Sequence, residues 1–194
     1  MRYILASGSP RRKELLTKVL AEFEIDPAVS EEVCHKEEPS EIVEELSFQK
    51  ASEIFHKNLT ESRQGFVVIG ADTVVSYNHR VLGKPSGNQE AFEMVKMLQG
   101  QVHSVFTGVT LFFFDGDEPR HVTFSECTRV RVSPMTDEEI QEYVDSGEPL
   151  DKAGAYGIQG MFGRYITGID GDYYNVVGLP VARLYQELKR KSLI

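Results

Sequence analysis

The chain begins with a short apolar run, and a turn of small residues follows it. Residues 2–6 (RYILA) predict a buried strand. Ser9 and Pro10 follow, and serine at the N-cap with proline at the first helical position is the preferred start of a helix. The helix predicted there would place four apolar residues on one face: Leu15, Leu16, Val19 and Leu20.

A longer helix is predicted between residues 40 and about 56. Val43, Leu46 and Ile54 recur at helical spacing and would form its apolar stripe. Lys50 lies on the same stripe, four residues from Leu46 and four from Ile54. A lysine on the inward face of a helix is not an ordinary surface lysine, because burial of its charge requires a partner.

Strands are predicted in the middle of the chain. Residues 66–75 (FVVIGADTVV) form the most apolar strand candidate, broken by Gly70 and Asp72. Residues 103–114 and 121–132 predict two long strands that are joined by the polar turn DGDEPR, hence a hairpin.

Three further helices complete the pattern. One is predicted over residues 90–98 and another over residues 181–191. The third is predicted to begin at a capping box that is formed by Thr136 and Glu139. Residues 145–160 are rich in glycine and predict a loop. The last helix would turn four side chains inward: Val181, Leu184, Tyr185 and Leu188.

Helices interleaved with strands, together with a long hairpin, predict a mixed-sheet α/β or α+β fold. A chain of 194 residues can bury a core without disulfides or metals. We therefore expect a single domain over residues 1–194, with a change of lobe around residues 125–135 as the alternative.

The net charge of −9 argues against a general nucleic-acid or anionic-membrane binder, because binding to a phosphate backbone needs a broad basic surface. A local basic site for a small anionic ligand remains open. Cys34 and Cys127 belong to no CxxC pair, which fits a reducing compartment and gives no zinc signature. With no apolar stretch of membrane-spanning length, the pattern predicts a soluble, cytoplasmic protein.

The turn that precedes the first predicted helix is a candidate anion site. Arg11 and Arg12 stand at the helix start, where cations oppose the helix dipole, and a bound anion would reverse that cost. Gly8 would let a ligand approach the backbone closely. The alternative is a strand, a turn and a helix with two solvated arginines.

Asp72 is a candidate functional carboxylate because apolar residues flank it on both sides. A carboxylate inside a strand needs a cation or hydrogen-bond donors, and Lys50, Lys84, a metal or a local turn are the candidate partners. The pair Glu31 and Glu32 would suit Mg²⁺ or Mn²⁺, although solvated acidic pairs are common.

The glycine-rich loop holds a further candidate, Gln159, in the segment GIQG. Its amide both donates and accepts, which suits the edge of a nucleotide base, whereas an ordinary turn-rich connection is the alternative.

Eight segments form one recognisable set in order along nearly the whole chain: ASGSPRRKELL (6–16), the glutamates at 31–32, Lys50, GADTVV (70–75), LGKP (82–85), GxxHSVxTGV (100–109), SGEPLDKAGAYGIQG (146–160) and GDYYNVVGLP (171–180). Together they resemble the Maf family of nucleoside triphosphate pyrophosphatases. The first, fourth and seventh are the most specific. The resemblance implies an elongated mixed sheet flanked by helices, related to the inosine triphosphate pyrophosphatase fold.

The resemblance also implies an activity. Family members cut a nucleoside triphosphate between the α- and β-phosphates, release a nucleoside monophosphate and pyrophosphate, and require a divalent metal, Mg²⁺ or Mn²⁺. Thr73 and Gln159 match the markers of the branch that prefers dTTP and UTP, and Arg11 matches a third residue associated with substrate choice. The family further implies a homodimer.

Roles for individual residues follow from the resemblance. Asp72 would act as the general base on the attacking water and would ligate the metal together with Glu32. Positive charge would stabilise the reacting phosphates, while two hydroxyls would hold phosphate oxygens. The residues expected to bind substrate in these ways are Ser7, Ser9, Arg11, Arg12, Lys50 and Lys84.

Two alternatives to a dTTP/UTP pyrophosphatase stay open at this point. One is an enzyme of the related fold that hydrolyses inosine or xanthosine triphosphate. The other is a nucleotide-binding regulator of cell division with little turnover, although binding alone does not need a water-activating carboxylate such as Asp72.

Overall fold

The computed structural model describes residues 1–59 and 65–194 and contains a seven-stranded sheet with helices. The strand order is β2-β1-β3-β5-β6-β7, and β4 pairs with β3. β1 runs parallel to β2 and β3, whereas β4 and β7 pair antiparallel with their neighbours, so the predicted mixed sheet is confirmed. The strands are β1 Arg2–Leu5, β2 Glu24–Ile25, β3 Phe66–Tyr77, β4 Arg80–Leu82, β5 Val102–Asp115, β6 Glu118–Val132 and β7 Ile166–Asp170.

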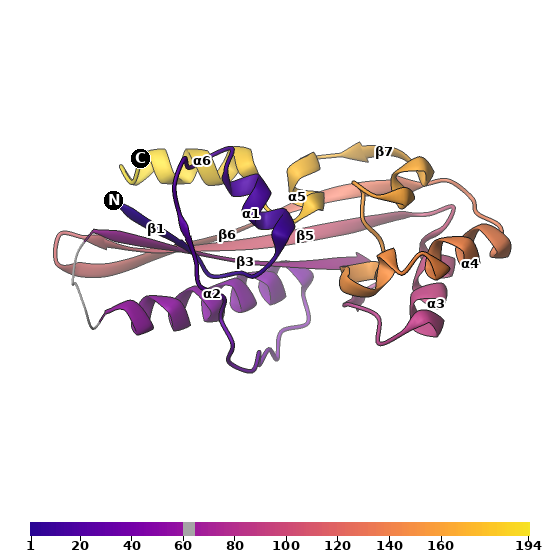
Figure 1. Ribbon diagram of the computed structural model, residues 1–194, viewed down its shortest axis with the longest axis horizontal. Coiled ribbons are helices and arrows are strands. Elements are labelled where there is room, and N and C mark those ends of the chain that lie inside the picture. Colours follow the sequence, from indigo (N-terminus) through magenta and orange to yellow (C-terminus); the bar gives the residue numbers. More distant parts are fainter. Residues whose placement is uncertain (60–64) are drawn as a thin grey trace. The chain divides into compact units, whose positions relative to one another are not determined.

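The helices lie between the strands, as the sequence pattern predicts (Figure 1). The α-helices are α1 Pro10–Leu16, α2 Pro39–Asn58, α3 Asn88–Leu98, α4 Asp137–Asp145, α5 Tyr173–Val177 and α6 Val181–Arg190. Three 3₁₀ turns follow α4, namely η1 Glu148–Asp151, η2 Ala153–Ala155 and η3 Met161–Tyr165.

The chain divides into two compact units. The first contains Met1–Asp72, Thr107–Glu126 and Gly178–Ile194, and the second contains Thr73–Phe106 and Cys127–Val177. Strands β3, β5 and β6 contribute residues to both units. One passage between the units, from Glu126 to Cys127, falls in the range where the sequence suggested a change of lobe. The single domain expected over residues 1–194 stays a prediction.

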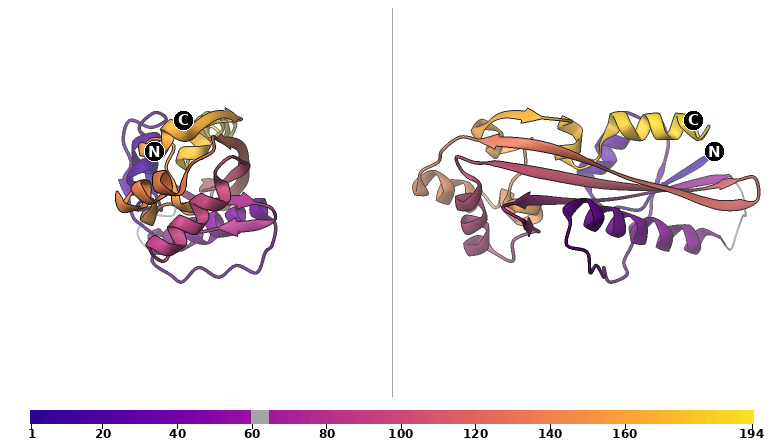
Figure 2. Two further views of the ribbon diagram at one scale, coloured as in Figure 1. Left: turned by 90° about the vertical axis from the view of Figure 1, so that its right-hand side faces the viewer. Right: turned by 180° about the vertical axis from the view of Figure 1, so that it is seen from behind.

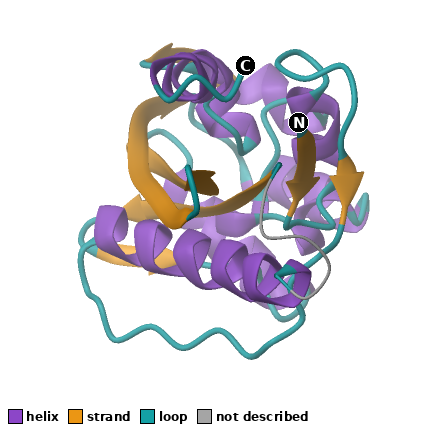
Figure 3. Ribbon diagram, turned by 90° about the vertical axis from the view of Figure 1, so that its left-hand side faces the viewer, coloured by secondary structure: helices purple, strands orange, loops and turns teal. Residues whose placement is uncertain are grey.

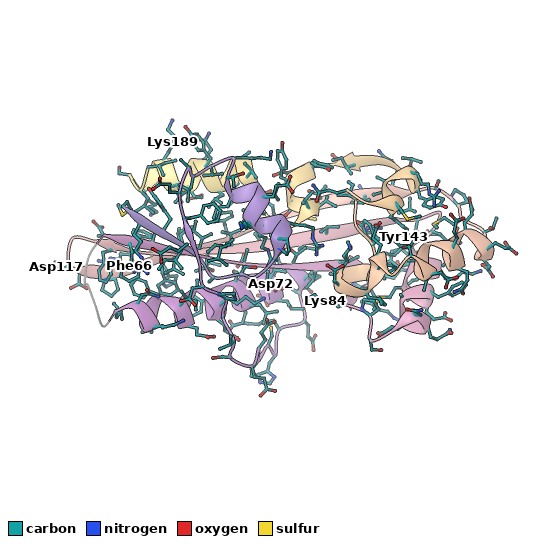
Figure 4. The ribbon with its side chains drawn as sticks, in the orientation of Figure 1. Phe66, Asp72, Lys84, Asp117, Tyr143 and Lys189 are labelled. Atoms are coloured by element: carbon teal, nitrogen blue, oxygen red, sulfur yellow. The ribbon has the colours of Figure 1, made fainter. Side chains whose placement is uncertain are left out.

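In the first unit, helices cover both faces of the sheet. Helix α2 lies on one face, and α1 and α6 lie on the other (Figures 1, 2 and 3). The core beneath α2 is aromatic, with the ring of Phe55 within 5.3 Å of the rings of Phe66 and Phe112 (Figure 4). The two ends of the chain also meet in this unit, because the Tyr3 hydroxyl donates to the Leu193 carbonyl at 2.5 Å.

Two glycines let α2 approach the sheet at backbone distance. A Cβ on Gly70 of β3 would lie 2.4 Å from the Ser47 carbonyl oxygen, and one on Gly108 of β5 would lie 2.2 Å from the Val43 carbonyl oxygen. The α2 residues that face the two glycines form a central buried row of Val43, Ser47 and Ala51, of which Ser47 and Ala51 are small.

This contact corrects two sequence predictions. Leu46 is only partly buried and is not part of the central row of α2. Gly70 and Asp72 do not break the strand either, because β3 continues through both residues. The glycine marks the position where the helix approaches, which is why a strand interior accepts it.

The second unit has a core of its own between the sheet and the helices α3 and α4. Tyr143 of α4 is fully buried, and its ring lies 5.2 Å from that of Phe162 in η3. The predicted capping box is confirmed, since Thr136 accepts the Glu139 N–H and the Glu139 carboxylate accepts the Thr136 N–H.

Several element boundaries differ from the prediction. Helix α1 ends at Leu16, so Val19 and Leu20 lie in the turn that follows it. Tyr185 of α6 is 41% exposed and does not point inward. The β5–β6 hairpin closes over only two residues, Gly116 and Asp117, because its strands extend into the predicted turn. The glycine-rich loop is built of 3₁₀ turns, and the short elements β2, β4, β7 and α5 were not predicted.

We expect Gly108→Ala to destabilise the protein by about 1–3 kcal/mol, because the added methyl group meets the α2 backbone and not a flexible side chain. Urea unfolding monitored by circular dichroism measures the change. Gly83→Ala is the matched control, since a Cβ there meets open space. Equal stability of the two variants would contradict the close contact.

Candidate functional site

The centre of the candidate site is an ion pair between α2 and β3. Lys50 Nζ lies 2.5 Å from Asp72 Oδ1, and the two side chains are only 16% and 13% exposed. The same nitrogen lies 3.1 Å from Glu32 Oε1. Lys50 and Asp72 are therefore each other's partners, and Glu32 adds a second carboxylate beside the ammonium group.

The close approach of α2 to β3 positions this pair. A Cβ on Gly70 would lie 2.8 Å from the backbone nitrogen of Ala51, so the helix passes directly over the glycine. Lys50 precedes Ala51 by one residue, and Asp72 follows Gly70 by two. Small residues on both elements thus bring the long side chain of Lys50 within reach of Asp72, the carboxylate labelled in Figure 4.

Arg12 is a second cation of this site, and it is built into the first unit. Its Nε donates to the Gly178 carbonyl at 2.9 Å and its terminal nitrogen donates to Ser7 Oγ at 3.2 Å. Burial lowers the pKa of the Arg12 guanidinium, and the negative charges of Asp72 and Glu32 act against that change. Arg12 therefore interacts electrostatically with the two carboxylates that contact Lys50, and it is not a solvated surface arginine.

The turn before α1 supplies two hydroxyl groups. Ser9 is the N-cap, and its Oγ accepts the Arg12 N–H at 3.5 Å, as predicted. Ser7 is buried, and its Oγ accepts the Ser9 N–H at 3.3 Å. These bonds use acceptor positions, and a hydroxyl that accepts can still donate its own hydrogen to an anion.

Arg11 is half-buried, and its charge lowers the pKa of Arg12, so the two guanidinium groups lie close enough to repel each other. Helix α1 has only seven residues, and Arg11 and Arg12 lie in its first turn. The positive charge at this end of the helix therefore comes mainly from the two side chains.

The predicted metal ligands, Glu32 and Asp72, both contact the ammonium group of Lys50. Two carboxylates that converge on one cation fit Mg²⁺ or Mn²⁺, which take one or two protein carboxylates and complete their shell with phosphate and water. In the part of the chain that the structure describes, no group of three or more His, Cys, Asp or Glu side chains is arranged to hold a metal by itself.

Three predicted substrate residues belong to the second unit. Lys84, labelled in Figure 4, is exposed just after β4. Thr73 lies on β3 and is half-buried, and Gln159 is exposed in the turn between η2 and η3. The residues that the structure brings together in the first unit are Ser7, Ser9, Arg11, Arg12, Glu32, Lys50 and Asp72.

The loop that carries Gln159 is fixed by the half-buried carboxylate of Glu148. Glu148 accepts the Tyr143 hydroxyl at 3.1 Å and the Met161 N–H at 2.8 Å, so it joins both ends of the loop. Gly160 packs against this carboxylate, since a Cβ there would lie 2.1 Å from Glu148 Oε1. The loop is rich in glycine because it folds tightly over its own side chains.

A buried histidine anchors the middle of the same loop. His103 Nε2 lies 2.7 Å from the Tyr156 hydroxyl, and both side chains are buried. Burial lowers the pKa of His103 from 6.5 to about 4, so the ring is neutral at physiological pH. A neutral ring can donate to or accept from the tyrosine without a buried charge.

Several of these residues were missed by reasoning from the sequence alone. Glu148 and His103 lie within two of the segments that carry the family resemblance, but neither was assigned a role. Gly178 adopts a φ of 125°, which favours glycine, but nothing in the sequence indicates that its carbonyl accepts from Arg12.

The chain folds as a mixed α/β sheet with helices, and its candidate site holds a largely buried carboxylate among cations. The chain belongs to the Maf family, because the family model described as "Maf-like protein" matches residues 2–191.

Similar proteins cover nearly the whole chain. The "dTTP/UTP pyrophosphatase" of Agathobacter rectalis is 53% identical over 197 residues and covers 96% of each chain. The protein of the same name from Lachnoclostridium phytofermentans is 47% identical, covering 96% of this chain and 93% of its own.

Among solved structures, the Ham1 protein of Staphylococcus aureus is similar at a TM-score of 0.49 and 12% identity, covering 98% of this chain and 100% of its own. Similarity at this level carries no argument about chemistry. A separate finding is that none of the helices within residues 1–59 and 65–194 has the length and apolar character needed to cross a membrane.

The buried His103 predicts a specific loss of stability in acid. The unfolded state binds more protons than the folded state between pH 6.5 and about 4, so stability falls as the pH falls through this range. We expect this histidine to account for up to about 3 kcal/mol of the loss. Urea unfolding of the wild type and of His103→Gln, measured at pH 7 and pH 4.5, isolates its share. The same pH dependence in both proteins would show that His103 is not buried in the neutral form.

Proposed function

We propose that this protein hydrolyses nucleoside triphosphates, with dTTP and UTP as preferred substrates and modified pyrimidine nucleotides as further ones. The bond cut lies between the α- and β-phosphates, and the products are a nucleoside monophosphate and pyrophosphate. The observation that carries the proposal is the buried Lys50–Asp72 pair with Glu32 and Arg12 beside it. The two relatives named dTTP/UTP pyrophosphatase, each similar over more than nine-tenths of both chains, support the same activity.

Asp72 is the residue to which we assign water activation. Lys50 donates to its Oδ1, which fixes the plane of the carboxylate and leaves Oδ2 for the water. Oδ2 then takes the proton as the water attacks phosphorus. A positioned carboxylate base of this kind contributes typically about 10²–10⁴-fold to the rate.

The cations of the site stabilise the negative charge of the phosphates. Phosphoryl transfer depends mainly on position and on stabilisation of charge, and Arg12 and Lys50 supply fixed positive charge beside the base. The hydroxyl groups of Ser7 and Ser9 donate to phosphate oxygens from the turn before α1. A divalent cation held by Glu32 and Asp72 would neutralise part of the charge of the triphosphate.

Selection of the nucleotide base, the oligomeric state, the location and the absence of nucleic-acid binding stay predictions. Arg11, Thr73 and Gln159 are expected to select the pyrimidine, and Lys84 is expected to contact phosphate. A homodimer, a cytoplasmic location and no binding to nucleic acid are expected as well. Light scattering and filter binding would test the dimer and the nucleic-acid expectation.

We expect Asp72→Asn to lower kcat for UTP hydrolysis by at least about 100-fold, because the amide cannot accept the proton from water. Far-ultraviolet circular dichroism should remain that of the wild type. Asp117→Asn, in the exposed β5–β6 turn, is the control and should retain activity. Wild-type turnover by pure Asp72→Asn would rule out the assigned role.

A panel of triphosphates tests the substrate class. With Mg²⁺ or Mn²⁺ present, we expect pyrophosphate release to be fastest with dTTP and UTP and to stop when the metal is removed with a chelator. Preference for ITP would support the inosine triphosphate alternative instead. Tight binding of dTTP without pyrophosphate release would support a regulatory binding protein.

A further inference from the structure

Residues 29–33, the segment that carries Glu32, are joined to α2 by polar contacts. Val29 is 88% exposed and Val33 is 52% exposed, so the apolar side chains of this segment face solvent. An open pocket of about 400 Å³ lies between the segment and α2, lined in part by Ala28, Phe48 and Ser52. Hydrophobic packing therefore does not fix the position of Glu32.

Two side chains of α2 bind the backbone on either side of Glu32. The Glu53 carboxylate accepts the Val29 N–H at 2.9 Å and the Ser30 N–H at 3.1 Å. The Gln49 side chain accepts the Val33 N–H at 3.2 Å and donates to the Val33 carbonyl at 2.5 Å. Gln49 thus pairs with Val33 as a neighbouring strand would, and Glu53 fixes the other end.

These contacts surround Lys50 in the sequence of α2. Gln49 and Glu53 are four residues apart and lie on the same side of the helix, while Lys50 lies beside Gln49 and reaches Glu32 at 3.1 Å. One helix therefore carries both the cation and the two groups that hold the carboxylate against it. The hydrogen bonds to Val29 and Ser30 also lower the pKa of Glu53, which keeps it an ionised acceptor.

We propose that Gln49 and Glu53 are positioning residues that act through the backbone of residues 29–33. They set Glu32 against Lys50 and thereby determine how tightly the site takes a divalent cation. Neither residue touches the reacting atoms. The inference rests on the proposed function only for the metal, and the arrangement of the segment stands on the hydrogen bonds themselves.

The variant Glu53→Gln tests the proposal because it keeps the shape of the side chain. The amide oxygen can accept one N–H, but its NH₂ group cannot accept the other. Groups behind a metal ligand typically change metal affinity about 10–100-fold when they are altered, so we expect Mn²⁺ to bind about tenfold more weakly. Relaxation of water protons by bound Mn²⁺ measures this without turnover. Gln49→Leu should have an effect in the same direction.

Two comparisons separate positioning from a general loss of structure. Glu41→Gln removes one exposed carboxylate from the first turn of the same helix and should leave Mn²⁺ affinity unchanged. On a Glu32→Gln background, Glu53→Gln should weaken Mn²⁺ binding no further, because the ligand that it positions is already lost. Amide exchange should accelerate at Val29, Ser30 and Val33 in Glu53→Gln, while the core strands keep their protection.

Each other outcome has a definite meaning. Faster exchange in the segment without weaker Mn²⁺ binding would overturn the proposal, as would additive effects of Glu32→Gln and Glu53→Gln. Hydrolysis by a wild-type protein that binds no Mn²⁺ would overturn it too, yet would leave the proposed function intact. Mn²⁺ binding with the expected variant effects, in a protein that hydrolyses no triphosphate, would instead reject only the proposed function.

Discussion

The contact of α2 with the sheet at backbone distance is the constraint on which the candidate site depends. Gly70 and Gly108 remove the side chains that would separate the helix from β3 and β5. Long side chains on the flank of the helix then reach the neighbouring strand and segment. Lys50 extends from that flank to Asp72, and the same helix reaches outward to residues 29–33. The close packing of α2 on the sheet therefore determines which charged side chains of the site come into contact.

Much of the fold could be predicted from periodicity because its long elements are strongly patterned. The hairpin strands and α2 were found for that reason. The short elements were missed because two to five residues carry no period, as in β2 and α5. The prediction that Gly70 breaks a strand failed because a glycine in sequence looks the same whether it ends a strand or admits a helix.

The candidate site could be predicted only in part. A lysine on an apolar stripe and an aspartate in an apolar strand are local anomalies, so the pairing of Lys50 with Asp72 could be anticipated, and it is confirmed. The bond from Arg12 to the Gly178 carbonyl could not, because it joins residues 166 positions apart through a backbone atom that has no signature. Gln49 and Glu53 read as ordinary surface residues of a helix until the segment that they bind is placed beside them.

The contacts of Tyr3 with Leu193 and of Arg12 with Gly178 have a consequence for how the chain matures on the ribosome. The first unit combines residues 1–72 with residues 178–194, whereas the second unit needs nothing after Val177. During translation, the second unit is thus the first to have all its parts. The hydrogen bond from Arg12 to the Gly178 carbonyl can form only after residue 178 has been synthesised, so this part of the site is completed late.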